Sequence, residues 1–344
     1  MTLPAKNSTI THEASDRVVR SERTPKSSSH RQSVLSLEHC NVFNFAHGSY
    51  DWLVARQGLV TASEIGIIMG YSSWSTALEL YNSKKATITP EESDRRGSSR
   101  QQQFGLHMEQ LMIEWVEQDL RLDKATLVNS LCISKEFPFA GATIDGLGSK
   151  DGELILLEFK TDQGYGDWGS KELPLQYKAQ VNWQMLVTGV SLAYLCVLPH
   201  GSADKLAIIE VVRDDILIDL MLHQAKIFMS GLAANVPPPA KEGDLKNLPF
   251  NVDKQEYEPS SHFLHLYKLY KELDTQKASK IDGLSGLDKQ IKDIKAQMAQ
   301  EMGEYASSYF ELDGKAVTVS RKVTVVPEKV VKEYTVQKIN IKEE

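Results

Sequence analysis

Three charged side chains interrupt two apolar runs in the segment FAGATIDGLGSKDGELILLEFKTD, residues 139–162. Asp145 lies in the first run, and Glu158 and Lys160 lie in the second. Because side chains alternate between the two faces of a β-strand, Glu158 and Lys160 share one face. The glycine-rich stretch between the runs is suited to reversing the chain. We therefore expect a hairpin in which Asp145, at the end of the first strand, lies beside Glu158.

Two adjacent carboxylates raise each other's pKa unless a cation lies between them. A hard divalent ion is the natural occupant, and Mg²⁺ suits a site with few protein ligands and open water positions. Lys160 could then orient a metal-bound water and stabilise negative charge that develops on a phosphate. The D…ExK spacing alone also fits an ion pair on a solvent-exposed hairpin, because such spacing is common by chance.

Two segments with helical spacing carry further polar side chains. Glu109 lies in FGLHMEQLMIEWV on a different face from the apolar positions, where an isolated glutamate is usually exposed. Gln180 and Gln184 lie four residues apart in YKAQVNWQMLVTG and therefore on one side of a helix. A glutamine amide donates and accepts hydrogen bonds, so either could hold a water or a carboxylate. Ordinary hydrogen bonding at the edge of the core is the alternative for Gln184.

The stretch RQGLVTASEIGIIMGYSSW predicts a phosphate-binding helix start. Thr61 and Glu64 match the S/T-x-x-E capping box, which places a helix N-terminus at residues 61–63 with free backbone N–H groups. Such an end attracts phosphate, and Arg56 could add a forked contact to the same group. A capped helix with an incidental arginine is the alternative, since capping boxes are common.

The remaining pattern predicts one α/β core with appendages. Residues 1–37 are rich in Ser, Thr and Arg and are predicted to be a disordered basic tail. Residues 38–236 are predicted to form the core, which opens with a hairpin near Phe43 and ends with two strands, LAYLCVLP and LAIIEVV.

A proline-rich, polar linker is predicted for residues 237–260, because three consecutive prolines cannot continue a helix. Residues 261–344 are predicted to form one or two amphipathic helices, interrupted near Gly283 and Gly286. A β-hairpin is expected to follow at the Asp313-Gly314 pair.

Composition excludes several classes of protein. A content of 41% hydrophobic residues is enough for a sizeable core in 344 residues. No run approaches the roughly 18 apolar residues of a membrane span and no secretory signal is evident, so we expect a cytoplasmic protein without a membrane partner. Cys40, Cys132 and Cys196 are too far apart to suggest a disulfide framework, a zinc site or an iron–sulfur cluster.

The net charge of −7 argues against a non-specific nucleic-acid binder, which is normally basic. It does not argue against a nuclease, because metal ions held by carboxylates supply positive charge locally.

Four motifs in a fixed order resemble a known family. They are R-x-G-[LI]-x-T-A-S-[ED]-I-x-x-[IV]-[ML]-G-x-S-x-W, G-x-x-x-E, D-G…[LI]-E-x-K and Y-x-x-Q-x-x-x-Q-M-x-V-T-G. Together they cover residues 52–189 and resemble the phage lambda exonuclease and YqaJ-type viral recombinase nucleases, a branch of the PD-(D/E)xK superfamily. The resemblance implies a restriction-endonuclease-like core, with a mixed central sheet flanked by helices. The proline of the superfamily's name is absent, since Ile144 precedes Asp145.

The resemblance also implies a role for each motif residue. Mg²⁺, for which Mn²⁺ can substitute, would be held by Asp145, Glu158 and the backbone carbonyl of Phe159, with Glu109 completing the site directly or through water. Lys160 would be the catalytic lysine, and Gln180 would help position the attacking water. The residues implied to hold the 5′-terminal phosphate of DNA are Arg56, Thr61 and Ser63. Trp74 would stack on the DNA end, with core packing as its alternative.

The implied activity is Mg²⁺-dependent 5′→3′ digestion of one strand of duplex DNA in a bacterial or phage-infected cytoplasm. Its product would be 3′ single strands for a strand-annealing recombinase, and some members of the family form a ring-shaped homotrimer around DNA.

Two alternatives stay open. One is a Cas4- or RecB-like nuclease that acts on single strands or endonucleolytically, although such enzymes commonly carry a four-cysteine cluster that three cysteines cannot build. The other is a non-catalytic module that binds DNA ends or a recombinase. Such a module needs basic groups and has no use for a carboxylate cluster.

Overall fold

The computed structural model describes residues 37–90, 99–162, 168, 173–199, 202, 205–251, 256–279, 284–326 and 334–343. The predicted basic tail, residues 1–37, lies outside the described residues except for Leu37.

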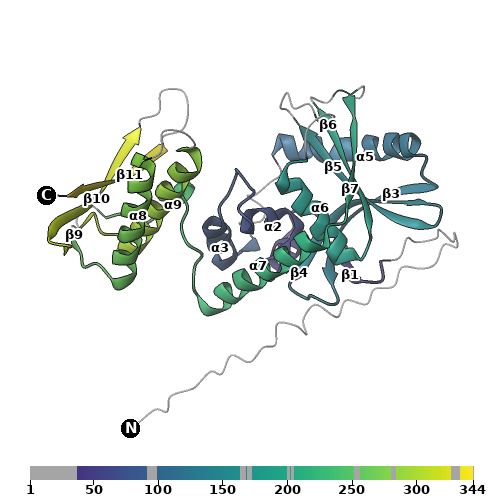
Figure 1. Ribbon diagram of the computed structural model, residues 1–344. Coiled ribbons are helices and arrows are strands. Elements are labelled where there is room, and N and C mark those ends of the chain that lie inside the picture. Colours follow the sequence, from purple (N-terminus) through teal and green to yellow (C-terminus); the bar gives the residue numbers. More distant parts are fainter. Residues whose placement is uncertain are drawn as a thin grey trace, which may run out of the picture. The chain divides into compact units, whose positions relative to one another are not determined.

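A mixed seven-stranded sheet forms the centre of the core (Figure 1). Its strands are β1 (Cys40–Phe43), β2 (Val60–Thr61), β3 (Lys124–Ser134), β4 (Ala140–Lys150), β5 (Glu153–Asp162), β6 (Leu192–Pro199) and β7 (Ala207–Val212). The order is β1-β3-β4-β5-β6-β7, with β2 paired to β4. The β2–β4 and β5–β6 pairs are parallel and the others are antiparallel. The predicted neighbouring strands LAYLCVLP and LAIIEVV are β6 and β7.

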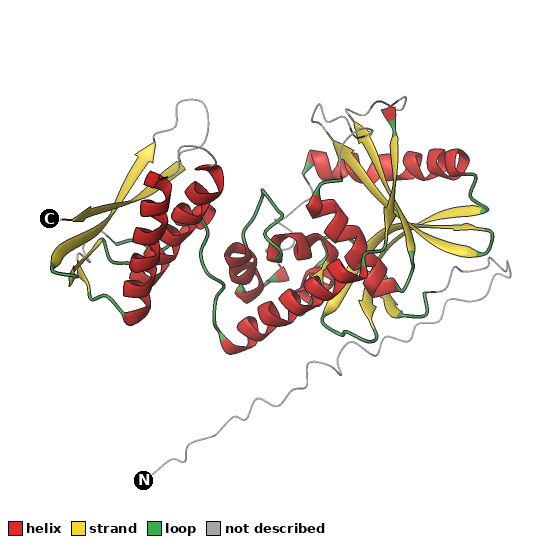
Figure 2. Cartoon of the chain, viewed as in Figure 1, coloured by secondary structure: helices red, strands yellow, loops and turns green. Residues whose placement is uncertain are grey.

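Helices cover both faces of this sheet (Figure 2). They are α1 (Tyr50–Gln57), α2 (Ala62–Ile68), α3 (Ala77–Lys85), α5 (Arg100–Leu120), α6 (Leu175–Thr188) and α7 (Asp215–Ala234). Met112 and Val116 of α5 pack in one cluster with Leu157 and Phe159 of β5. Glu158 lies between these two strand residues and bonds to α6, so α6 covers the opposite face. The predicted α/β core, a mixed sheet flanked by helices, is confirmed.

The hairpin between β4 and β5 turns at Asp151 and Gly152, which have φ values of 53° and 84°. The predicted chain reversal is therefore confirmed, but the first strand does not end at Asp145. It continues to Lys150, where it pairs with Glu153. Asp145 consequently lies inside β4.

The expected opening hairpin is wrong. β1 instead pairs with β3, from Cys40↔Ser134 to Phe43↔Leu131, and the chain then forms helix α1. The side chain of Ser49 caps this helix by accepting a hydrogen bond from the backbone N–H of Trp52 at 3.3 Å.

Helix α7 is long and apolar enough, by length and composition, to cross a membrane. One such helix is weak evidence, because core helices of soluble proteins pass the same test. It packs against α2 and α6, and Ile218, Met221 and Phe228 on its inner face are buried.

The C-terminal part pairs two helices with a second sheet. Its elements are the 3₁₀ helix η2 (Glu242–Asn247), β8 (Glu256–Tyr257), α8 (Ser261–Ser279), α9 (Leu284–Met302), β9 (Ser307–Leu312), β10 (Lys315–Val326) and β11 (Tyr334–Glu343). The sheet order is β11-β10-β9-β8. Buried side chains from both helices and the sheet, such as Phe263, Met298 and Val319, form one core. Ala240 and Leu248, from the segment predicted as a linker, are buried in the same core.

The expected hairpin at Asp313-Gly314 is present, with φ values of 53° and 75° at these residues. The expected interruption near Gly283 and Gly286 agrees with two separate helices, since α8 ends at Ser279 and α9 begins at Leu284. Gly283 lies outside the described residues, and Gly286 itself lies inside α9.

Candidate active site

The candidate site lies where β4 and β5 stop pairing. Their antiparallel ladder runs from Lys150↔Glu153 to Gly146↔Leu157. Beyond Leu157, β5 remains paired only with β6, while the start of β4 pairs with β2 and β3. Asp145 and Glu158 follow directly after the last ladder pair, so the fork holds one carboxylate from each strand.

Glu158 is the most enclosed carboxylate of the site, with 2% of its surface exposed. Gln180 donates its amide N–H to Oε1 of Glu158, and Gln184 donates to Oε2 at 2.5 Å. Lys160 also donates to Oε1 of Glu158, as expected for two residues on one strand face. The interpretation of this pair as a solvent-exposed ion pair is therefore wrong, and both glutamines of α6 act on the same carboxylate.

Asp145 accepts one hydrogen bond at Oδ2, from the backbone N–H of Phe159 at 3.0 Å. Burial, followed by repulsion from Glu158, raises the pKa of Asp145 well above its ordinary value. Burial also lowers the pKa of Lys160, but the carboxylates of Glu158 and Asp145 more than offset this, so the net shift is upward. The Lys160 side chain is therefore protonated and positively charged in this site.

Glu109 extends from α5 toward the fork. Its Oε2 is buried and has no hydrogen-bond partner among the described residues, while Asn129 bonds to the carboxylate. Burial and then repulsion from Glu158 raise the pKa of Glu109. Asn129 occupies a bulge in β3 between Leu127 and Ser130, with a φ of 45°. The bulge in β3 thus places the side-chain amide of Asn129 beside the carboxylate of Glu109.

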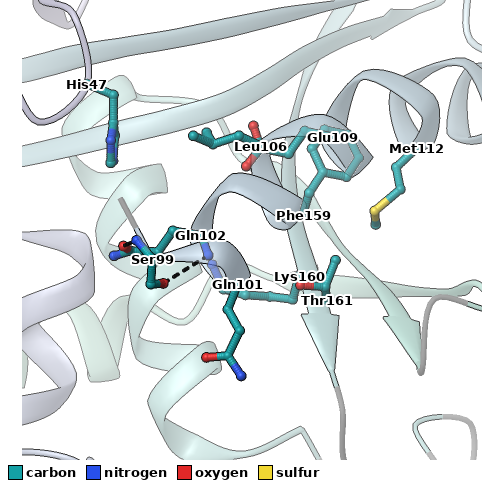
Figure 3. Close-up of a pocket in the computed structure, with 11 residues that line it drawn as sticks. His47, Ser99, Gln101, Gln102, Leu106, Glu109, Met112, Phe159, Lys160 and Thr161 are labelled. Carbon is teal, nitrogen blue, oxygen red and sulfur yellow. Dashed lines mark hydrogen bonds between the residues drawn. The ribbon is translucent and has the colours of Figure 1, made fainter. Parts of the chain in front are cut away.

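A cavity of about 370 Å³ joins these side chains to the predicted phosphate-binding turn. The predicted residues that line it are Arg56, Thr61, Ser63, Glu109, Asp145, Glu158, Lys160 and Gln180. A second cavity of about 650 Å³ lies on the other side of Glu109 and Lys160, and its lining includes Gln101, Gln102, Phe159 and Thr161. Figure 3 shows this second cavity, with Lys160 and Thr161 of β5 facing the first turn of α5.

The donor chemistry fits a hard divalent cation. No three His, Cys, Asp or Glu side chains in the described part of the chain already have the arrangement of a metal site. Three carboxylates nevertheless line one cavity at the fork, and Oε2 of Glu109 is buried without a hydrogen-bond partner among the described residues. A cation among them would remove the repulsion that raises the pKa of Asp145 and Glu109.

Arg56 is held in place at the other end of the first cavity. Its Nη2 donates to Oγ1 of Thr61 at 3.1 Å and to Oγ of Ser63 at 3.2 Å. Its guanidinium lies over the ring of Trp52, 4.2 Å from the ring centroid. His47 packs against the same tryptophan, with ring centroids 4.6 Å apart, and lines both cavities. A cation, two hydroxyls and a helix start therefore face one space.

Trp74 lies apart from this arrangement. It is 78% exposed, so the core-packing alternative is wrong, and it is not among the residues that line either cavity.

The sequence analysis did not identify three residues of the site, His47, Trp52 and Asn129. The spacing of Trp52 and Arg56, four residues apart in YDWLVARQ, was a usable signal. Asn129 gave none, because its orientation depends on the bulge.

Comparisons with known proteins agree with the motif-based resemblance. Residues 51–191 match the YqaJ-like viral recombinase domain. The uncharacterised protein YqaJ of Bacillus subtilis (strain 168) is 29% identical over 201 residues, which are 56% of this chain and 59% of that relative. The chain thus spans about three fifths of the length of this curated relative.

Two solved exonuclease structures also match. The alkaline exonuclease LHK-Exo of Laribacter hongkongensis has a TM-score of 0.43 and 21% identity, over 55% of this chain and 94% of that chain. A phage-related exonuclease of Haemophilus somnus 129PT has a TM-score of 0.35 and 15% identity, over 52% of this chain and 95% of that chain.

The matched residues 51–191 include the predicted phosphate-binding turn, the β4–β5 fork and both helices that supply the candidate site. This central domain is therefore similar to the YqaJ-like viral recombinase domain, in agreement with the resemblance that the motifs carry.

Proposed function

We propose that the protein is a metal-dependent deoxyribonuclease that digests duplex DNA from its 5′ ends. One observation carries this proposal: a single cavity is lined by the carboxylate–lysine cluster and by the Arg56, Thr61 and Ser63 turn. The cluster is suited to phosphodiester hydrolysis and the turn to binding a phosphate. A nuclease that holds a terminal phosphate in the cavity where it cuts is confined to ends.

Asp145, Glu158 and Glu109, with the backbone carbonyl of Phe159, would hold Mg²⁺ or Mn²⁺. When bound, the cation would activate a water and neutralise charge on the scissile phosphate. Lys160 lies beside Glu158 and would donate hydrogen bonds to that phosphate or to the attacking water. Gln180 and Gln184 keep the Glu158 carboxylate in one orientation, which fixes the face it presents to the cavity.

Digestion in this direction leaves 3′ single strands, the substrate of a strand-annealing recombinase, and the family's description as viral recombinases supports that pairing. A ring-shaped homotrimer and a cytoplasmic location are further parts of the proposal, from the family resemblance and the composition.

Digestion of linear duplex DNA labelled separately at its 5′ and 3′ ends tests the proposal, in Mg²⁺, in Mn²⁺ and in EDTA. We expect metal-dependent loss of the 5′ label, faster from 5′-phosphate than from 5′-hydroxyl ends. Lys160→Ala should abolish it, while Lys150→Ala, at an exposed position on the same hairpin, should not. Each variant is also tested for DNA binding, which should persist in Lys160→Ala.

The other outcomes point to the alternatives. Cutting of circular or single-stranded DNA would favour a Cas4- or RecB-like activity. Binding of ends without digestion in any metal would favour a non-catalytic module. Equal rates in wild type and Lys160→Ala would remove the assigned mechanism.

A further inference from the structure

A buried lysine supports the arginine of the phosphate-binding turn. Lys84 is on α3, which packs against α2 (Figure 1), and its side chain is only 4% exposed. Its ammonium donates to Oε2 of Glu64 at 2.9 Å and to the backbone carbonyl of Arg56 at 3.1 Å. Burial lowers the pKa of Lys84, and the neighbouring Glu64 opposes this shift. The lysine therefore connects the carboxylate of α2 to the end of α1.

Glu64 has two further contacts in the turn. Its Oε2 accepts the backbone N–H of Thr61 at 2.9 Å, which closes the start of α2. Its Oε1 lies 3.9 Å from Nη2 of Arg56, at the limit of an ion pair. The same Nη2 is the atom that donates to Thr61 and Ser63. Glu64 is thus placed to compete with an incoming phosphate for Arg56.

The local charges show why a second cation is needed. Arg56 and Glu64 alone would sum to zero, and a neutral pair attracts a phosphate dianion weakly. With Lys84 the group carries one net positive charge, and the closer ion pair is Glu64–Lys84 at 2.9 Å rather than Glu64–Arg56 at 3.9 Å. Both contacts exclude most solvent, so the charges are little screened.

We infer that Lys84 is a positioning residue: it neutralises Glu64 and holds the end of α1, so that Arg56 stays available for the terminal phosphate of DNA. This inference rests on the proposed function, because it concerns the preference for 5′-phosphate ends. Lys84 lines neither cavity and acts only through Glu64 and Arg56.

The test measures the ratio of kcat/KM on 5′-phosphate ends to kcat/KM on 5′-hydroxyl ends. In Lys84→Met this ratio should fall about tenfold or more, as when one charge-assisted hydrogen bond is lost. The loss should appear mainly in KM. Adding Glu64→Gln to Lys84→Met should restore most of the ratio, because glutamine can still accept the N–H of Thr61 but no longer competes for Arg56. A merely structural role would lower kcat/KM on both kinds of end and would leave their ratio unchanged.

Glu64→Gln alone covers the case in which Lys84→Met folds poorly. It keeps the cap and removes a negative charge, so its ratio should equal or exceed that of the wild type. A tenfold fall in this variant would overturn the inference, as would a wild-type ratio in well-folded Lys84→Met. A wild-type enzyme with no preference for 5′-phosphate would instead contradict the proposed phosphate anchor. The two failures are therefore distinguishable.

Discussion

Gln184→Met should destabilise the protein through loss of the amide that holds Glu158. Gln184 is 1% exposed, and its Nε2 donates to Oε2 of Glu158 at 2.5 Å and to the carbonyl of Thr143 at 3.2 Å. Methionine has nearly the same shape and no donor. The substitution therefore leaves both acceptors unpaired in the core without creating a large cavity.

The magnitude follows from the two bonds. The bond to a carbonyl contributes about 0.5–1.5 kcal/mol and the bond to a charged carboxylate about 1.5–3 kcal/mol. Burial of the apolar methionine side chain offsets about 1 kcal/mol of this loss in the free energy of unfolding. We expect the free energy of unfolding to fall by about 1–3.5 kcal/mol, measured by urea unfolding in EDTA. Gln118→Met, at an exposed position of α5, is the control and should change it by less than about 0.5 kcal/mol.

A double-mutant cycle separates the two bonds. In a Glu158→Gln background the carboxylate is absent, so the cost of Gln184→Met should drop to about 1 kcal/mol, the contribution of the neutral bonds. An equal cost in both backgrounds would refute the assignment of Gln184 as a support of the Glu158 carboxylate.

The remaining predictions concern pH and two glycines. Because the pKa of Asp145 is raised in the folded state, the folded protein binds that proton more tightly than the unfolded chain, and stability is lost as pH rises from the ordinary value of 3.8 through the raised one. Asp145→Asn should therefore raise the Tm of the metal-free protein at about pH 8 and flatten its pH dependence in melts in EDTA; a lower Tm would contradict this. Gly189→Ala should lower the free energy of unfolding by about 1–2 kcal/mol, since Gly189 has a φ of 75° and the new Cβ would meet the His39 ring at 2.3 Å. Gly286→Ala, in open space inside α9, should raise it by about 0.5–1 kcal/mol, and equal effects of the two substitutions would count against the backbone argument.

The shared faces of the site residues could be predicted from the sequence, because the geometry of strands and helices determines which side chains point the same way. A two-residue period places Glu158 and Lys160 on one face in any register, and a helical period does the same for Gln180 and Gln184. The position of the fork could not be predicted. The fork forms because β4 pairs with β2 and β5 pairs with β6 beyond the hairpin ladder. Both partners are distant in the sequence from the hairpin, so their pairing could not be inferred from local patterns.

The segment at residues 49–57 carries a helix signal that the sequence analysis did not use. Ser49 precedes YDWLVARQ, and Asp51 lies in the first turn, so capping and charge both favour a helix there. Recognition of that helix would have brought Trp52 and Arg56 to one face. No comparable signal marked Lys84, one of two adjacent lysines, because only the packing of α3 against α2 buries it.

The degree of hydrogen bonding separates a structural ion pair from a catalytic cluster in this fold. A structural pair is retained when each buried charge is satisfied, because an unpaired one is costly. Glu158 meets that condition, with two amides and one ammonium. Asp145 accepts one backbone N–H, and Oε2 of Glu109 has no partner among the described residues. The three carboxylates of this cavity thus range from fully to partly hydrogen-bonded, which leaves ligand capacity at Asp145 and Glu109. An arrangement built only for stability would have no reason to leave that capacity unfilled, which supports the proposed cation site.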